Sequence, residues 1–201
     1  MPNWATVTRK IYGSKENLKT IEDAITKCEN AKKAIVNNGF GKLWLGCVVT
    51  ALGGDWKKVA CRGEITSYCM AEDYLQIESM EAWGEQEEFR HFIEQCFTSE
   101  DGDRAIDITY YCSEPGMCEY YTNDPDCDAV YMDVWSLDEE GEDADFCDSY
   151  EADSTEDALY WIAETFFDDT SDDFDTLEEA EEAMKKAGFR ISIYEYEYQE
   201  D

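Results

Sequence analysis

Residues 4–12, which read WATVTRKIY, decide the fold because they predict the strand on which a first sheet is built. Ala5, Val7 and Ile11 fall on one side of an extended chain, and polar or amphipathic residues fall on the other. Strict alternation of this kind is typical of a strand that is buried on one face. Gly13 and Ser14 then end the strand.

The segments that follow alternate between helical and strand periodicity in a fixed order. The predicted elements are a helix over 15–36, a helix over 43–52, strands over 64–69 and 74–80, a helix over 89–97 and a strand over 106–112. Strand, helix, strand, strand, helix, strand is the split βαβ or ferredoxin-like order, here with one helix inserted before the second strand. We therefore expect an α+β fold, with helices on one face of a mainly antiparallel sheet.

Residues 125–201 predict an acidic extension that is docked on a domain formed by residues 1–124. A strand is expected through Val130, Met132 and Val134, and residues 138–153 read as an acidic loop too polar to pack. Two helices then begin at the capping boxes of Ser154 and Thr176, and a last strand covers residues 189–198. The extension is thus predicted to have the order β-α-α-β.

Charge is divided unevenly along the chain. Residues 1–63 carry 11 Lys and Arg against 5 Asp and Glu, a net charge of +6, whereas residues 64–201 carry 5 against 44, a net charge of −39. Carboxylates at this density repel phosphates, so residues 64–201 are not expected to bind DNA or RNA directly. They favour a basic protein as partner, because complementary charge steers association.

The charge pattern predicts a non-catalytic interaction protein that mimics nucleic acid and inhibits a DNA- or RNA-binding host-defence protein, of the anti-restriction or anti-CRISPR type. The predicted partner-binding residues are Asp138, Glu139, Glu140, Glu142, Asp143, Asp168, Asp169, Asp172 and Asp173. Two alternatives stay open. Acidity could serve the solubility of an accessory or scaffold protein, or an enzyme site could be assembled from residues distant in sequence.

No residue pattern predicts catalysis, a cofactor or a metal. His91 has no nucleophile beside it in sequence, and Cys112 and Cys118 lack a neighbouring base or cation. Residues 53–58 (GGDWKK) resemble an anion cradle but fit a helix end better. Residues 124–135 begin like a calcium loop, yet Ala129 stands where such a loop needs Gly. The sequence thus favours a protein without a metal site or a catalytic centre.

Cysteine usage and hydropathy predict a reduced, cytoplasmic protein. The nine cysteines include no C-x-x-C pair, and residues 1–10 lack an apolar signal-peptide core. No apolar run approaches the ~20 residues that cross a bilayer. Free thiols are therefore expected, and no membrane as partner.

A set of short strings gives the first 124 residues a resemblance to a known family. The strings are MPNW (1–4), NGFGKLWLGCVVTALGGDW (38–56), CRG (61–63), AW (82–83), EPGM (114–117) and TND (122–124). In this order they resemble the YubB-like ferredoxin-like-domain family of small phage, plasmid and gut-bacterial proteins. The chain departs from it at Ala5, where members commonly have Cys, and at Gly84-Glu85, where they tend to have Ser-Pro. The resemblance implies the ferredoxin-like fold and carries over no catalytic or binding residue.

Overall fold

The computed structural model describes residues 3–37, 39–99, 101–167 and 174–200, and it shows an α+β protein. The chain divides into two compact units, one formed by Met1–Asp124 with Glu200–Asp201 and the other by Pro125–Gln199. Each unit has its own sheet, helices and core, and the two are described separately below.

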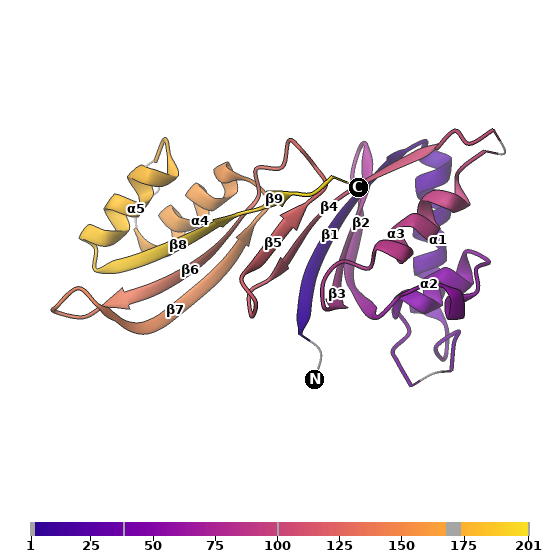
Figure 1. Ribbon diagram of the computed structural model, residues 1–201, viewed down its shortest axis with the longest axis horizontal. Coiled ribbons are helices and arrows are strands. Elements are labelled where there is room, and N and C mark those ends of the chain that lie inside the picture. The colour runs from indigo at the N-terminus through magenta and orange to yellow at the C-terminus, as the bar shows by residue number, and fades with distance from the viewer. Residues whose placement is uncertain (1–2, 38, 100, 168–173, 201) are drawn as a thin grey trace. The chain divides into compact units, whose positions relative to one another are not determined.

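The first unit is built around β1 (Trp4–Gly13), which lies inside its sheet (Figure 1). The other elements are α1 (Lys15–Asn30), α2 (Leu45–Ala51), the 3-10 helix η1 (Trp56–Lys58), β2 (Gly63–Met70), β3 (Tyr74–Ala82), α3 (Glu87–Cys96), β4 (Ile106–Glu114) and β5 (Glu119–Thr122). The strands lie in the order β2-β3-β1-β4-β5, with every neighbour antiparallel. The first strand and residues 106–112 thus share one sheet, as predicted.

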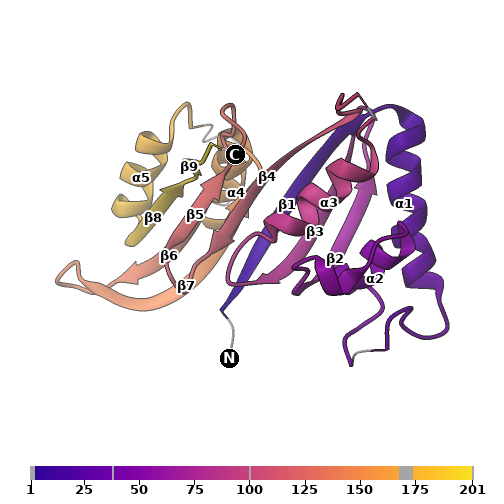
Figure 2. The same cartoon turned by 45° about the vertical axis from the view of Figure 1, so that its right-hand side comes forward.

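The helices α1, α2 and α3 lie on one face of this sheet, as Figure 2 shows. Alternate strand residues such as Ile11, Ile77 and Ile108 point to that face and pack with apolar helix residues such as Ile25 and Phe89. All five are almost completely buried. Burial of this apolar face is the main force that holds the helices on the sheet.

The first helix is shorter than predicted, because it ends at Asn30 and not at residue 36. Ala31 takes an extended conformation (φ −62°, ψ 141°), and its N–H bonds to the Cys28 carbonyl. The chain then turns so that Val36 packs in the core at 8% exposure, while Ile35 stays 37% exposed. The prediction that the helix continues to residue 36 is therefore wrong.

An ion-pair network is buried among the apolar residues of the first unit. Arg9 is fully buried, and its guanidinium donates to both Glu81 carboxylate oxygens (2.5 and 2.9 Å) and to Glu85 (2.5 Å). The Phe89 ring lies 5.5 Å from the guanidinium. Burial opposes the charge on Arg9, but the two carboxylates outweigh it and raise the pKa of Arg9. The Arg9 guanidinium therefore remains charged inside the protein.

A strained turn between β3 and α3 brings Glu85 into this network. Trp83 has a φ of 62°, which is uncommon for a bulky residue, and Gly84 follows with a φ of 110°. The Glu85 N–H then donates to the Tyr121 hydroxyl (2.8 Å). A Cβ on Gly84 would collide with the same hydroxyl, so this position needs glycine for its conformation and for its close packing.

The second unit has a three-stranded antiparallel sheet in the order β7-β6-β8. Its elements are β6 (Val130–Leu137), β7 (Asp143–Ala152), α4 (Thr155–Phe166), α5 (Leu177–Lys186), β8 (Phe189–Glu195) and the short β9 (Glu197–Tyr198). Met132 and Val134 of the central strand pack against Ile162 of α4 and Met184 of α5. The Ser154 and Thr176 hydroxyls accept the N–H groups of residues 157 and 179, which confirms the predicted N-caps.

The expected acidic loop over residues 138–153 is wrong, because most of it forms strand β7. The prediction took a high density of carboxylates as evidence against packing. In the structure β7 is an outer strand, held to β6 by backbone pairing from Val130↔Ala152 to Leu137↔Asp143. A strand at the edge of a sheet can expose both faces near its end. Backbone pairing with β6 holds β7 in place although β7 has few apolar side chains. The extension thus has the order β-β-α-α-β-β, not β-α-α-β, because the predicted last strand over residues 189–198 is divided into β8 and β9.

Helix length and composition bear on the expectation that no membrane is crossed. The longest helix in the described residues, α1, has 16 residues, many of them charged. None of the helices in the described part of the chain is long and apolar enough to span a membrane.

Candidate functional site

The turn between β6 and β7 presents the first group of predicted partner-binding residues. Asp138 holds the turn together, because its Oδ1 accepts the N–H groups of Glu140 and Glu142, both at 2.9 Å. Gly141 completes the turn with a φ of 82°. Glu139, Glu140 and Glu142 are exposed and have no such structural task. The carboxylates of Glu139, Glu140 and Glu142 are therefore exposed at the tip of the hairpin, and the Asp138 carboxylate holds the backbone of the turn.

Strand β7 extends this acidic surface along the outer edge of the second sheet. Asp143, Asp145 and Asp148 are exposed on it. Asp143 accepts two hydrogen bonds from the Arg190 guanidinium of β8 (2.7 and 2.6 Å), across the end of the central strand. We call residues 138–148 the acidic hairpin. Sequence reasoning chose its first half and missed Asp145 and Asp148, because it assigned no strand there.

The sheet face opposite α4 and α5 carries aromatic rings among the carboxylates. Trp135 of β6 packs edge-on against Phe146 of β7, with ring centroids 5.1 Å apart, and Tyr131 lies 6.3 Å from Tyr194 of β8. Phe146 is 52% exposed. Burial raises the pKa of Asp133, which lies on the same face. Aromatic rings that lie exposed on a surface are typical of sites that bind proteins.

The negative charge of the second unit is not neutralised from within. Residues 125–199 hold 26 Asp and Glu but only 3 Lys and Arg. Of these cations Arg190 pairs with Asp143, and Lys186 lies 3.5 Å from Glu182. Three cations cannot offset 26 carboxylates, so the unit presents a strong negative field to its surroundings.

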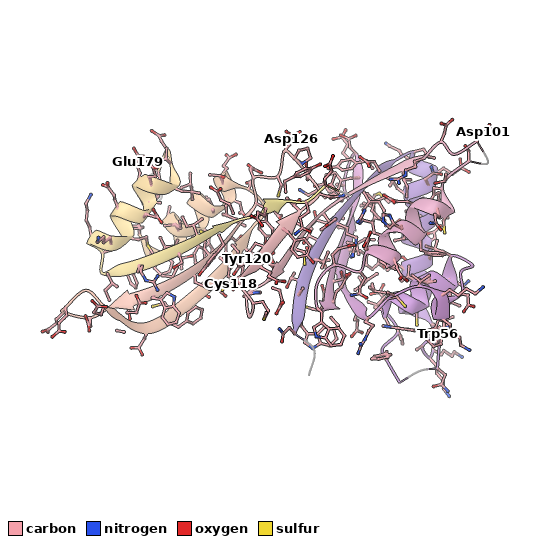
Figure 3. The ribbon with its side chains drawn as sticks, in the orientation of Figure 1. Trp56, Asp101, Cys118, Tyr120, Asp126 and Glu179 are labelled. Carbon is pink, nitrogen blue, oxygen red and sulfur yellow. The ribbon has the colours of Figure 1, made fainter. Side chains whose placement is uncertain are left out.

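The second group of predicted partner-binding residues, Asp168, Asp169, Asp172 and Asp173, lies outside the described residues. The expectation that these residues share a face with the acidic hairpin therefore stays a prediction. On the described helix that follows them, Glu179 (labelled in Figure 3) accepts the N–H of Asp175, one residue before the N-cap Thr176.

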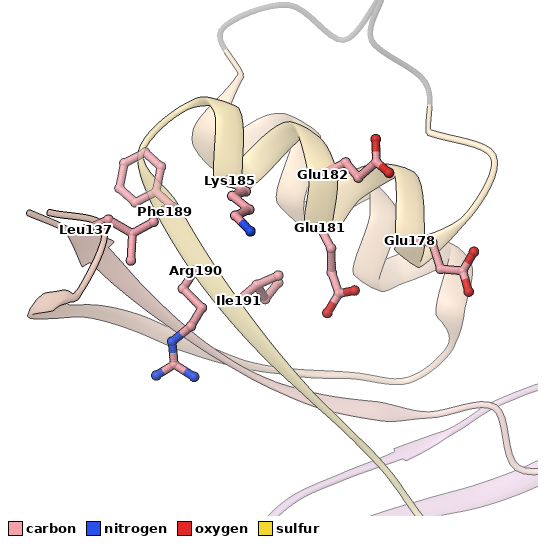
Figure 4. Close-up of a pocket in the computed structure, with 9 residues that line it drawn as sticks. Leu137, Glu178, Glu181, Glu182, Lys185, Phe189, Arg190 and Ile191 are labelled. Atoms are coloured by element: carbon pink, nitrogen blue, oxygen red, sulfur yellow. The ribbon is translucent and has the colours of Figure 1, made fainter. Parts of the chain in front are cut away.

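A cavity of about 550 Å³ lies between α5 and the end of the second sheet. It is lined by Leu137, Gly141, Glu178, Glu181, Glu182, Lys185, Phe189, Arg190 and Ile191 (Figure 4). Its three glutamates are neighbours on one helix, and two cations lie near them. No group of three potential metal ligands is gathered among the residues that the structure describes. The cavity is thus lined by both acidic and basic side chains, and its described residues do not have the geometry of a metal centre.

The residues considered for catalysis lie in unreactive surroundings. Burial raises the pKa of Cys112 to about 12, so its thiol stays protonated near neutral pH. Cys118 lies in the exposed β4–β5 turn with a φ of 55° (Figure 3). His91 hydrogen-bonds Glu94 (2.9 Å) and Glu87 (3.2 Å) of its own helix, and the bond to Glu94 is the main cause of its raised pKa. Both ring nitrogens of His91 are thus occupied by carboxylates of its own helix.

The possible anion cradle at residues 53–58 is a helix end. The Gly53 and Gly54 N–H groups donate to the carbonyls of Thr50 and Val49 at the end of α2. The Lys57 N–H donates to the Asp55 carboxylate, which caps η1. These three backbone donors are therefore occupied and cannot bind an anion.

The thiols give a prediction that tests the cysteine assignments one by one. No disulfide joins any of the nine cysteines, and all nine lie in described residues. Under native conditions, alkylation should label the exposed Cys69, Cys96, Cys118 and Cys147 first. Cys127 is partly exposed and should follow, whereas Cys28, Cys47, Cys61 and Cys112 are buried and should react only after denaturation, to give nine labels by intact mass. Seven labels or fewer in the denatured, unreduced protein would contradict a fully reduced state.

Comparison with protein families, with curated proteins and with solved structures finds no match for this chain. The resemblance of residues 1–124 to the YubB-like family therefore stays a prediction, and the functional argument rests on the geometry described above.

Proposed function

We propose that the protein is a non-catalytic, cytoplasmic inhibitor whose second unit occupies a basic groove on a nucleic-acid-binding host protein. The observation that carries the proposal is the exposed acidic hairpin, in a unit where 26 carboxylates face 3 cations. Such a surface repels nucleic acid and attracts the proteins that bind it. The partner is thus defined by its chemistry as a basic protein with a groove for phosphates.

We also assign the first unit to the ferredoxin-like arrangement, with the YubB-like proteins as its relatives. Support comes from the strand order β2-β3-β1-β4, in which β1 and β3 are the central pair and the last strand of the split βαβ unit, β4, lies beside the first. In this assignment β5 and helix α2 are additions to the common core. The role of the first unit in inhibition is to carry the acidic unit.

The spacing of charge supports mimicry by the whole hairpin and not by one strand. Successive residues of a strand advance ~3.3 Å, so Asp143, Asp145 and Asp148 place a charge every ~7–10 Å. One DNA strand places a phosphate every ~3.4 Å along the helix axis. The turn carboxylates at 139–142 add charge at the end of β7, where the density approaches that of a nucleic acid.

The exposed aromatic rings favour an interface over acidity that serves solubility alone. A solubilising surface needs charge without exposed rings, and large apolar side chains on it would work against its purpose. Here Phe146 lies exposed between Asp145 and Asp148 and packs on Trp135. This observation favours the hypothesis of an interaction protein over that of a scaffold protein.

Displacement from DNA tests the proposal. Host-cell proteins are first bound to duplex-DNA beads at low salt, and the purified protein is then added. Release of a particular basic protein, identified by mass spectrometry and suppressed at high salt, is the expected result. Poly-glutamate at equal total charge serves as the control for unspecific polyanions. If the protein releases only what poly-glutamate releases, the proposal is wrong and the scaffold takes its place.

A further inference from the structure

A second cavity, of about 300 Å³, opens in the first unit and is independent of the acidic hairpin. It is lined by Trp4, Phe40, Gly41, Trp44, Arg62, Gly63, Glu64 and Ala82. These residues come from the start of β1, the segment before α2, the start of β2 and the end of β3. We call it the tryptophan pocket. Its volume is at the lower end for ligand sites, about 300–1,000 Å³, and suits one small planar molecule.

The sheet itself creates the slot of this pocket. Trp4 of β1 pairs with Ala82 of β3, and the Ala82 N–H donates to the Arg62 carbonyl on the next strand (2.9 Å). Since Gly63 and Glu81 face the opposite side of the sheet, these three side chains lie in one cross-strand row. A small residue between two large ones leaves a gap. Ala82 is thus the floor of a slot between an indole and a guanidinium.

Stacked aromatic rings fix the wall of the pocket. Phe40 stacks on Trp44 with ring centroids 5.3 Å apart, and Trp56 packs edge-on against Trp44 at 5.2 Å. The Trp44 ring rests directly on Gly46, where any Cβ would collide with it. Trp4 and Phe40 are nevertheless 48% and 59% exposed. The wall is therefore formed without a ligand, and the Trp4 and Phe40 rings are partly exposed to solvent.

Two charged side chains stand at the pocket without a counter-ion. The Arg62 guanidinium lies 4.4 Å above the Trp83 ring, which holds it beside the slot. The Glu64 carboxylate rests against Gly41, where a Cβ would displace it. In the described part of the chain, no ion pair or side-chain hydrogen bond engages either group. One acceptor and one cation are therefore presented to a ligand.

We propose that the tryptophan pocket binds the guanine base of a free guanine nucleotide. A neutral base stacks well between an aromatic ring and a guanidinium plane. The two adjacent donors of guanine, N1–H and the 2-amino group, match the two oxygens of the Glu64 carboxylate. Adenine places an acceptor at N1, which the carboxylate repels. A free nucleotide is favoured over a strand because the acidic remainder of the chain repels a polymer of phosphates.

Titration with GMP, AMP and L-tryptophan tests the proposal, read by intrinsic fluorescence and calorimetry on the full chain. GMP should bind at least tenfold more tightly than AMP, and L-tryptophan should not bind. The Glu64→Gln variant should weaken GMP binding at least tenfold, since a charged acceptor is lost. Ala82→Leu should abolish binding by filling the slot. Glu72→Gln, an exposed carboxylate outside the pocket, is the matched control and should bind as the wild type does.

Several results would overturn the assignment. Equal affinity for GMP and AMP would remove guanine as the ligand, and binding of L-tryptophan alone would make the pocket a site for an aromatic amino acid. Tighter binding of a guanine-containing pentanucleotide than of GMP would contradict the free nucleotide. Because Ala82→Leu could disturb the sheet, its circular dichroism and melting curve are compared with the wild type. Loss of GMP binding in a folded Glu64→Gln protein supports the proposal even if Ala82→Leu fails to fold.

Discussion

Replacing Arg9 with Met should lower the free energy of unfolding by about 3–5 kcal/mol, the largest stability effect expected of a single substitution in this protein. Arg9 is fully buried and is bonded to both Glu81 and Glu85. The Met side chain fills much of the same space but leaves the Glu81 carboxylate without its cation and Glu85 with only Arg90, 3.6 Å away. Urea denaturation followed by circular dichroism measures the loss.

Two further variants separate the charge effect from a general loss of packing. Lys19→Met removes exposed ion pairs with Glu22 and Asp23, and because solvent screens such pairs its effect on stability should be small. Adding Glu81→Gln to Arg9→Met removes the carboxylate that has lost its cation and should recover part of the stability, while Glu85 stays paired with Arg90. An Arg9→Met protein as stable as the wild type would show that the network has no structural role.

Neutralising the acidic hairpin should slow association with the partner by about tenfold at low salt, with a much smaller change in dissociation. The variant combines Glu139→Gln, Glu140→Gln, Glu142→Gln and Asp145→Asn. It spares Asp138 and Asp143, because Asp138 holds the turn and Asp143 pairs with Arg190. Stopped-flow or surface-based kinetics on the captured partner, at low and high salt, measures both rates.

The matched control removes the same charge from the first unit. Glu72→Gln, Asp73→Asn, Asp101→Asn and Asp103→Asn change four exposed carboxylates and leave the hairpin intact. Net charge alone would slow both variants equally, whereas a local binding surface slows only the hairpin variant. Equal association rates for the wild type and the hairpin variant at low salt would make these carboxylates a solvated surface.

Periodicity was sufficient to predict the first sheet and insufficient to find the buried charge within it. The alternation of Ala5, Val7 and Ile11 gave the strand, and Arg9 occupies the one position on that side that is not apolar. This break in the pattern was the available signal. Its partners Glu81 and Glu85 could not be named, because they approach Arg9 only through strand pairing and the turn at Trp83.

The exposure of residues 138–143 could be predicted from the sequence, but the strand that continues from them could not. The carboxylates at 138–143 were chosen from charge density, and they do lie exposed at a hairpin tip. The same charge density led to the wrong prediction of a loop in place of β7. A strand with few apolar residues depends on pairing with its neighbour, and its own sequence gives little sign of that pairing. The contact of Trp135 with Phe146 and the slot over Ala82 both depend on strand register, which composition does not reveal.

Competition with duplex DNA tests the central claim most directly. A host protein released from the DNA beads is purified and bound to a fluorescently labelled duplex at low salt, and the acidic protein is then titrated in. We expect duplex and protein to exclude one another, with the labelled DNA released as the protein binds, and with less release by the hairpin variant. A stable ternary complex, in which the partner holds DNA and protein together, would show that the acidic unit does not occupy the nucleic-acid groove.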